Sequence, residues 1–288
     1  MARAPRKSGC RLILLRAAGW GVLAALVAGC PAVPDTEEPV RLDTTGVEPG
    51  VDYSDLAAVV EEAFVQDRSL RECHLIIPYA VNRKADRLDA QLKRLAVTGP
   101  TATPALLATG EDRLAYWYNA RAAWALKLAM LHGLPEEIDC AVLNTRAFPL
   151  DGRTMTLREI DEVLARDDDW RTLVASPGVL MGRACLPERP FTSGDVRQRI
   201  ANRIEQLIDD DRRFVIDVGR REVRVPRVLW RFRRRIIDDY HVRYNTRGAT
   251  LTTALLPSMS GSPLRRLQDA IGYRCVPAPP CKRIAREE

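Results

Sequence analysis

The sequence predicts a mainly helical α+β fold, built as a single domain with two short β-hairpins. Two observations carry this prediction. Apolar residues recur at helical spacing in several segments, and two stretches rich in strand-forming residues are each divided by a short turn. Of the 288 residues, 46% are hydrophobic, which is enough for a buried core, and we find no internal repeat.

Three helices are predicted in the first half of the folded region, which begins near Asp52. The second of them ends at the Gly-Pro pair at 99–100, because both residues disfavour a helix. The third and strongest runs from about Glu111 to His132. Acidic residues at its start favour the positive end of the helix dipole, and a glycine directly follows it.

The first hairpin is predicted around Asp151-Gly152, because this pair suits a primed turn with positive φ at its centre. Thr156 and Glu159 then have the spacing of a capping box. They predict a helix that runs to about Arg166.

The second hairpin is predicted at residues 213–225, between two further helices. Ser193 or Asp195 begins the helix before it, since both residue types accept backbone hydrogen bonds at a helix start. Pro226 suits the first turn of the helix after it.

The N-terminus has the pattern of a bacterial lipoprotein signal peptide over residues 1–29. Basic residues precede an apolar stretch that is shorter than the ~20 residues of a membrane span. Leu26-Val27-Ala28-Gly29 then leads to Cys30, where cleavage would expose a thiol for lipidation. Membrane attachment through Cys30 is therefore predicted. Pro31, rather than Asp, follows the cysteine and predicts the periplasmic face of the outer membrane.

Four segments are predicted along the chain from composition and periodicity. They are the signal peptide at 1–29, a proline-rich tether at 30–50, the folded domain at 51–245, and an irregular C-terminal segment at 246–288. We expect the tether to be disordered over 31–50.

Most of the net positive charge of the chain, which is +6, lies at its N-terminus. Five of the 44 basic residues lie in the signal peptide, which leaves 39 against 38 acidic residues in the mature chain. The overall balance therefore does not predict nucleic acid as a partner.

Seven cysteines are present, and five remain after removal of Cys10 and lipidation of Cys30. In an oxidising envelope compartment, four of the five could form two disulfides. We predict a disulfide between Cys275 and Cys281, because the proline-rich residues between them suggest a compact turn. The connectivity of the others stays open. The five are Cys73, Cys140, Cys185, Cys275 and Cys281.

Three separated segments resemble the domain-of-unknown-function 547 family in their residues, order and spacing. The resemblance spans about Tyr53 to Tyr240. The segments are Leu114-Ala115-Tyr116-Trp117-Tyr118-Asn119-Ala120, Leu157-Arg158-Glu159-Ile160 and Ala184-Cys185-Leu186-Pro187.

The chain departs from the pattern of that family at several polar positions. The family has a Trp-x-Asn-x-Tyr-Asn run, and this chain keeps Trp117 and Asn119 but has Arg121 where the family has tyrosine. The family's Ile-Glu-His is here Ile-Asp-Glu at 160–162, so the histidine is absent. The resemblance therefore implies a divergent member that has lost much of any polar site.

Cys185 is the best single candidate for chemistry. A nucleophilic thiolate needs a lowered pKa and a base, and Arg183 and Arg189 flank the cysteine while His241 or His132 could serve as base. The structural alternative is a buried thiol or a disulfide partner. We predict a reduced Cys185 with an ordinary pKa.

No spacing typical of a metal site occurs, and the sequence predicts neither a metal nor a cofactor. His74 adjoins Cys73, but sequence neighbours rarely bind one metal together.

The densest basic run is interleaved with Trp230 and Phe232 and could hold phosphates, lipid headgroups or RNA. The alternative is a solvated helix face with Asp238 and Asp239 as ion-pair partners. The run consists of Arg227, Arg231, Arg233, Arg234 and Arg235.

Two classes of function remain. The preferred one is a lipid-anchored envelope protein that acts as a binding or structural module for an unknown protein or small-molecule ligand. The alternative is a thiol-dependent enzyme, a hydrolase or transferase, that uses Cys185.

Overall fold

The computed structural model describes residues 40–42, 51–66 and 74–287. The chain divides into two units, Met1–Glu37 and Glu38–Glu288, of which the first lies outside the described residues. The signal peptide, Cys30, Cys73 and most of the predicted tether therefore also lie outside them. No described helix is both long enough and apolar enough to cross a bilayer.

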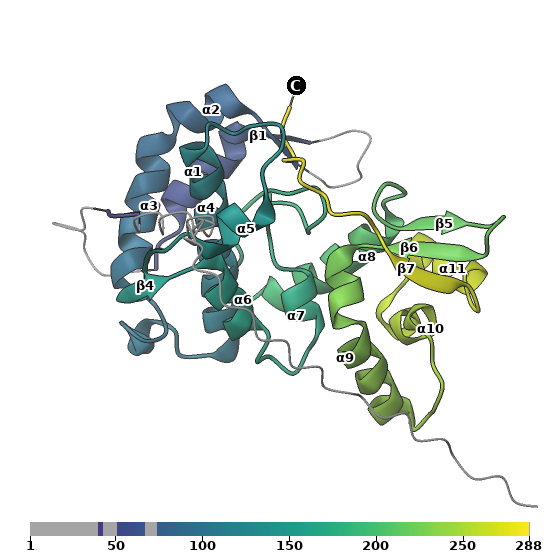
Figure 1. The fold of residues 1–288 in the computed structure, drawn as a ribbon. Helices are drawn as coiled ribbons and strands as arrows, with labels where there is room; N and C mark the ends of the chain where they lie inside the picture. Colours follow the sequence, from purple (N-terminus) through teal and green to yellow (C-terminus); the bar gives the residue numbers. More distant parts are fainter. Residues whose placement is uncertain (1–39, 43–50, 67–73, 288) are drawn as a thin grey trace, which may run out of the picture. The chain divides into compact units, whose positions relative to one another are not determined.

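The described part is mainly helical with small sheets of two and three strands, which confirms the predicted fold class (Figure 1). The helices are α1 (Ser54–Ala63), α2 (Pro78–Arg83), α3 (Ala85–Val97), η1 (Pro104–Leu106), α4 (Gly110–Leu131), α5 (Cys140–Thr145), α6 (Leu157–Leu164), α7 (Arg171–Val174), α8 (Val196–Asp209), α9 (Arg227–Tyr244), α10 (Leu251–Leu255), η2 (Leu256–Ser258) and α11 (Gly261–Asp269). The strands are β1 (Phe64–Gln66), β2 (His74–Ile76), β3 (Phe148–Leu150), β4 (Arg153–Met155), β5 (Val215–Asp217), β6 (Glu222–Val225) and β7 (Arg274–Pro277).

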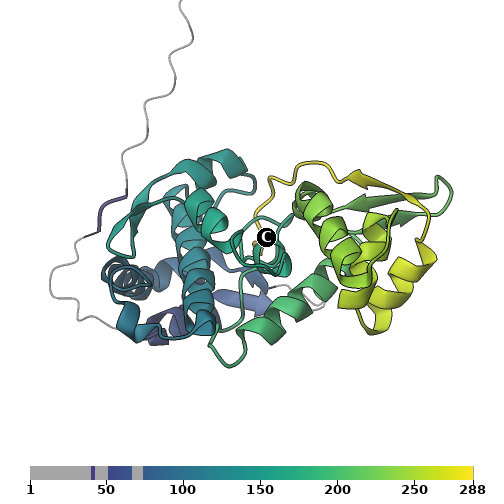
Figure 2. The same ribbon diagram turned by 90° about the horizontal axis from the view of Figure 1, so that it is seen from below.

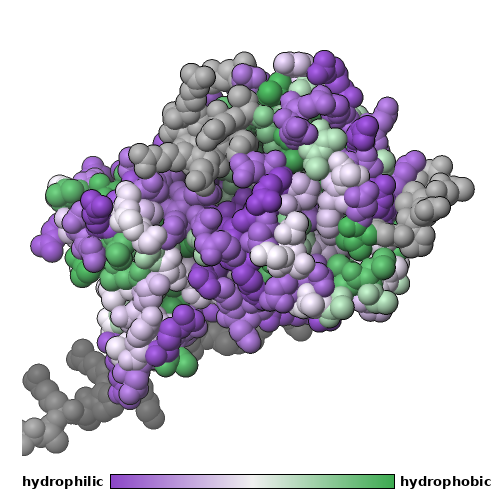
Figure 3. Space-filling model, turned by 180° about the vertical axis from the view of Figure 1, so that it is seen from behind, coloured by the Kyte–Doolittle hydropathy of each residue, from purple (hydrophilic) through white to green (hydrophobic). Residues whose placement is uncertain are grey.

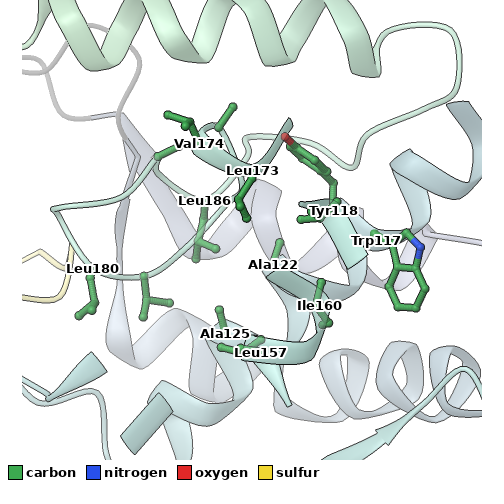
Figure 4. Packing of buried hydrophobic residues seen from close by; sticks show 14 of the residues in the cluster. Trp117, Tyr118, Ala122, Ala125, Leu157, Ile160, Leu173, Val174, Leu180 and Leu186 are labelled. Carbon is green, nitrogen blue, oxygen red and sulfur yellow. The ribbon is translucent and has the colours of Figure 1, made fainter. Parts of the chain in front are cut away.

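Helix α4 is the centre of the first half of the fold, and it matches the helix predicted from about Glu111 to His132. Its start is fixed by a capping box, in which Thr109 and Asp112 satisfy each other's backbone N–H groups. The helix is buried along most of its length and packs against α3, α5, α6 and α8. Alanines at 122 and 125 lie beside Leu157 and Ile160 of α6, and small side chains of this kind allow two helices to approach closely (Figure 4).

The Asp151-Gly152 turn forms as predicted and joins β3 to β4. Both residues have positive φ, at 56° and 72°. The backbone N–H of Asp151 donates to the Leu95 carbonyl at 3.0 Å, and that of Gly152 donates to the Ala96 carbonyl at 2.9 Å. The hairpin therefore caps the last turn of α3, where carbonyls lack partners within the helix.

The same turn requires a glycine in the loop after α3. A Cβ atom on Gly99 would lie 2.4 Å from the Asp151 carboxylate, and Gly99 has a φ of +156°. That carboxylate accepts hydrogen bonds from the backbone N–H groups of Thr101 and Ala102 at 2.7 and 2.9 Å. Close approach of the two loops thus depends on a missing side chain.

The second half of the fold contains the other predicted hairpin, β5 and β6, together with α8 to α11 (Figure 2). The prediction of an irregular segment at 246–288 was wrong, because this segment forms α10, η2, α11 and β7. Strand β7 pairs in parallel with β6, with Cys275 opposite Val223. Apolar side chains at Leu251, Leu255 and Leu267 are buried, which integrates the segment into the core.

The C-terminal segment at 282–287 returns to the first half of the fold and joins three parts of it (Figure 2). The Ile138 and Ile284 N–H groups donate to the Lys282 and Glu136 carbonyls, both at 2.9 Å. The Ala285 N–H donates to the Val179 carbonyl at 2.8 Å. The Ile76 N–H donates to the Ala285 carbonyl at 2.8 Å. Residue 245 is therefore not a domain boundary.

Part of the predicted tether is ordered on the domain. The Val40 N–H donates to the Ala147 carbonyl at 2.7 Å, and the side chains of Val40 and Leu42 pack against the core. The expectation of disorder over 31–50 was wrong for these residues, because two apolar side chains within a proline-rich stretch suffice for local docking. The rest of the tether, apart from residues 40–42, lies outside the described residues.

Candidate binding pocket

Cys185, the candidate nucleophile, is disulfide-bonded. It is buried, at 8% exposed, and packs against Met181. The other cysteines in the described ranges, Cys140, Cys275 and Cys281, are free, so the partner of Cys185 lies outside those ranges. The prediction of a reduced Cys185 was wrong. A sulfur held in a disulfide is not a thiolate nucleophile, and the thiol-dependent enzyme loses its central residue.

The predicted bridge between Cys275 and Cys281 was also wrong, since both thiols are free. Cys275 lies in β7, and the pairing continues past the strand because the Ala278 N–H donates to the Val225 carbonyl at 2.8 Å. The intervening prolines therefore extend the chain rather than turn it. Cys281 instead approaches Gly182, where an added Cβ would lie 2.9 Å from the Cβ of Cys281.

The arginines that flank Cys185 in sequence do not contact its sulfur in any hydrogen bond or ion pair of the described part. Arg183 binds Asp161 and Arg189 binds Asp195. Arg213, which follows α8, donates instead from Nη2 to the Cys185 Sγ at 3.0 Å, and from Nη1 to the Arg183 carbonyl at 3.0 Å. Tertiary packing, rather than sequence proximity, supplies the cation at this sulfur.

A polar cluster lies within the first half of the fold, where α4 meets α6 and the loop before Cys185. Arg121 is 1% exposed and donates from Nε to Asp161 at 2.7 Å, while its Nη1 donates to the Pro177 carbonyl. Arg183 binds the same carboxylate at 2.8 Å and the Ser176 hydroxyl at 3.2 Å. Burial alone would raise the pKa of Asp161, but the two guanidiniums outweigh it and lower the pKa to about 2.

Asn119, which the chain shares with the family pattern, joins α4 to the loop before α8. Its Nδ2 donates to the Phe191 carbonyl at 2.9 Å, and its Oδ1 accepts from the Phe191 N–H at 2.8 Å. The amide thus pairs with one residue in both directions, which is a structural role.

The candidate histidine bases, His132 and His241, lie at the C-terminal ends of α4 and α9. The Nε2 of His241 accepts from the Ala249 N–H at 3.2 Å and holds the loop after α9. His132 is the C-cap residue of α4, and its backbone N–H donates to the Ala129 carbonyl at 3.2 Å. His74 lies in β2. No hydrogen bond among the described residues joins Cys185 to an imidazole, so the structure does not support His241 or His132 as its base.

A pocket of about 820 Å³ opens beside Cys185, between α8, the turn that follows it and the start of α11. Its wall is mainly polar. Cys185, Arg203 and Arg213 line it together with Glu205, Ser260 and Ser262. The pocket thus contains Cys185, which the sequence analysis named as a candidate, together with residues that it did not name.

Arg203 is a buried cation in this wall, at 8% exposed. Its Nε donates to the Ala175 carbonyl at 3.0 Å and its Nη2 to the Cys185 carbonyl. No carboxylate of the described part lies within 4.0 Å of it. Burial lowers the pKa of Arg203 to about 9, and the neighbouring guanidiniums, including that of Arg213, act in the same direction.

The start of α11 adds further hydrogen-bond donors to the pocket. Ser260 occupies the N-cap position but does not cap the helix, because its hydroxyl donates to Glu205 Oε1 at 2.8 Å. The first N–H groups of the helix, including that of Ser262, therefore receive no side-chain cap. Uncapped N–H groups at a helix start attract anions.

Most carboxylates around the pocket already have cationic partners. Asp210 binds Arg213 at 3.0 Å and Arg212 at 3.4 Å, and Asp211 binds Arg266 at 2.5 Å. Arg203 is left as the buried cation without a carboxylate. In the described part of the chain, no group of three or more His, Cys, Asp or Glu residues could hold a metal ion.

Arg203 had a signal in the sequence that the interpretation did not use. It lies between Ile200 and Ile204 on the apolar face of α8, where a charged residue is rarely placed without a partner. Arg213 and Ser260 had no comparable signal, because their place in the pocket depends on how α8 and α11 pack.

Comparison with known proteins identifies no relative: no family model, no curated protein and no solved structure matches this chain. The three segments that carry the resemblance to the domain-of-unknown-function 547 family do lie on neighbouring elements, α4, α6 and the loop at 176–187. Membership of that family nevertheless stays a prediction. The chemistry of the pocket is the stronger guide to function.

Proposed function

We propose that this protein is a lipid-anchored binding module of a bacterial cell envelope, which takes a small anionic ligand in the pocket between α8 and α11. The observation that carries this proposal is Arg203, a buried guanidinium without a carboxylate partner in the wall of an 820 Å³ pocket. Its guanidinium donates to two carbonyl oxygens and lies 5.7 Å from the centre of the Phe191 ring, and an anionic group would supply the negative charge that these partners lack.

The arrangement of donors supports an anion over a neutral or cationic ligand. The uncapped start of α11 and the guanidinium of Arg203 belong to the same pocket, and Asp210 and Asp211 are neutralised by arginines. Glu205 opposes this preference, since its carboxylate lies beside the start of α11 and has no cationic partner among the described residues. It would select against large, highly charged anions and leaves small carboxylates or phosphate as the favoured class.

Binding is tested by thermal unfolding of the purified protein with two separate probes, inorganic phosphate and succinate. A ligand that binds only the folded state raises the midpoint of unfolding in a concentration-dependent way. We expect Arg203→Lys, which keeps the charge but loses the planar fork, to weaken binding by about tenfold. Glu205→Gln keeps the bond to Ser260 and removes a like charge, so it should tighten binding by several fold.

Arg197→Gln is the matched control, because Arg197 lies on the same helix but pairs with Glu111 and Asp167 outside the pocket. It should leave the affinity unchanged. Absence of any shift with either probe, or an equal loss in the control, would contradict the proposed ligand class. A shift with only one probe would identify the anionic group.

The anchor rests on the sequence run that ends at Cys30, outside the described residues. We propose that lipid on Cys30 holds the domain on the periplasmic face of the outer membrane. The wild-type protein should incorporate palmitate and partition into detergent, since two or three acyl chains give stable attachment. Cys30→Ala should abolish labelling and processing. The anchor would be rejected if the wild-type protein took up no palmitate, or if Cys30→Ala were processed at the same point as the wild type. Neither result would affect the proposal for the pocket.

We also propose that the domain is a divergent relative of the domain-of-unknown-function 547 family that binds rather than catalyses. Two of its departures from the family pattern, the buried Arg121 and the partly buried Asp161, form an ion pair with each other. In this chain, the polar positions are thus used for structure. The disulfide at Cys185 supports the same conclusion.

A further inference from the structure

Helix α9, which lies in the second half of the fold (Figure 1), carries a dense run of arginines. The first nine residues of α9, Arg227 to Arg235, contain five arginines and no acid. Arg227, Arg231 and Arg234 are exposed, and spacings of four and three place them on one face of the helix. We name these three residues the arginine face.

The other two arginines of the run have internal roles. The guanidinium of Arg233 stacks on Trp230, at 4.2 Å from the ring centre. Arg235 donates to the carbonyls of Ala165 and Asp167 and fastens α9 to the loop after α6. The run therefore divides into two residues that hold the helix in place and three that face outward.

The arginine face has no ion pair within 4.0 Å in the part of the chain that the structure describes. The acids expected to neutralise it do not, because Asp239 pairs with Arg243 at 3.3 Å and Asp238 forms no ion pair with a described residue. Arg227 donates from Nε to the Ala278 carbonyl at 3.2 Å, which fixes its stem but adds no negative charge.

This arrangement lowers the stability of the helix. Cations in the first turn oppose the helix dipole, and the first turn of α9 has no acidic residue and no side-chain cap. Like charges four and three residues apart also repel each other. A charge pattern that works against the local structure is expected where binding requires it.

We propose that the arginine face binds the anionic headgroups of a phospholipid surface. Each arginine near such a surface adds to the attraction, and a flat array of phosphates requires only charge on one exposed face. A single-stranded nucleic acid would also need aromatic rings for its bases. Trp230 is covered by Arg233, and Phe232 packs against the core, so neither offers an open ring.

The test uses the chain from Pro31 onward, which lacks the lipidation site but contains the whole compact unit Glu38–Glu288. Binding is measured by co-sedimentation with vesicles of phosphatidylcholine alone or with about one third phosphatidylglycerol. The wild-type chain should bind only the anionic vesicles, and added salt should weaken the binding because exposed charges are screened.

The variant Arg227→Gln/Arg231→Gln/Arg234→Gln should weaken binding to anionic vesicles by about tenfold to hundredfold, whereas Lys at the same three positions should retain it. The control Arg153→Gln/Arg158→Gln/Arg166→Gln removes the same charge from exposed positions elsewhere and should bind like the wild type. Circular dichroism checks that each variant is folded.

Three results would overturn the proposal. They are equal binding to neutral vesicles, an equal loss in the control variant, and tighter, arginine-face-dependent binding of a single-stranded oligonucleotide. None of these results depends on the anchor at Cys30 or on the pocket between α8 and α11.

Discussion

At the scale of single residues, buried arginines decide the chemistry of this protein. Arg121 and Arg203 are both nearly inaccessible, but Arg121 binds the Asp161 carboxylate, whereas Arg203 donates to carbonyl oxygens and lies over the Phe191 ring. Removing one partner of a buried ion pair leaves an uncompensated charge, which costs more than the pair contributes. Arg121 is therefore a structural residue, and Arg203 is the one that a ligand can still stabilise.

Asp161→Asn should lower the free energy of unfolding by about 3–5 kcal/mol, because the buried guanidinium of Arg121 and the partly buried guanidinium of Arg183 lose their carboxylate. The change is measured by urea unfolding at neutral pH. Asp238→Asn is the control, since Asp238 is exposed and has no ion pair among the described residues, and it should change stability by less than about 0.5 kcal/mol. Equal effects would contradict the role assigned to Asp161.

The same carboxylate predicts a dependence of stability on pH. The pKa of Asp161 falls from 3.8 to about 2 on folding, so its contribution is present above pH 3.8 and is lost as the pH falls towards 2. Urea unfolding of the wild type between these limits should show stability falling with pH. Asp161→Asn should show a shallower fall, and an identical slope would show that other groups control acid unfolding.

Cys185 should resist alkylation in the protein isolated from the envelope without reductant, because it is disulfide-bonded. Cys140 is exposed and free and serves as the internal control, which should react at once. Mass mapping before and after reduction distinguishes the two. Alkylation of Cys185 without reduction would restore the nucleophile hypothesis.

At the scale of elements, features set by neighbouring residues were predictable and those set by distant ones were not. The capping box of Thr156 and Glu159 and the turn at Asp151-Gly152 form as predicted, since both depend on local backbone chemistry. Strand β7 was missed because it exists only by pairing with β6, far earlier in the chain. The pocket was missed for the same reason, since Arg213 and Ser260 line one pocket only after α8 and α11 pack.

Gly99→Ala should destabilise the contact between the first hairpin and α3. The new methyl group would overlap the Asp151 carboxylate, and a φ of +156° disfavours any side chain. We expect a loss of at least about 1–3 kcal/mol. Gly110→Ala is the matched control, because nothing lies within 4 Å of its Cβ and it begins a helix. The midpoints of thermal unfolding of the two variants are compared. Equal midpoints would contradict the close approach of Gly99 to the Asp151 carboxylate.

At the scale of the whole molecule, the C-terminal segment decides whether the two halves of the fold are one cooperative unit. Residues 282–287 contact β2, the loop at 136–138 and the loop at 179–181, all of which precede α8. The segment follows β7, which belongs to the sheet of the second half. A chain end that pairs with both halves removes the boundary that composition suggests near residue 245.

Ile284 is the apolar centre of this segment, at 1% exposed, and its N–H donates to the Glu136 carbonyl. Ile284→Ala should cost about 2–5 kcal/mol, because truncation of a buried isoleucine leaves a cavity. Ile271→Ala, at a half-exposed position, should cost far less. Hydrogen exchange then locates the effect: amides of Ile76, Ile138 and Met181 should exchange faster in Ile284→Ala than in Ile271→Ala, while those within α9 should not. Uniform acceleration would indicate global destabilisation, and no acceleration at these three amides would show that the C-terminal segment does not join the halves.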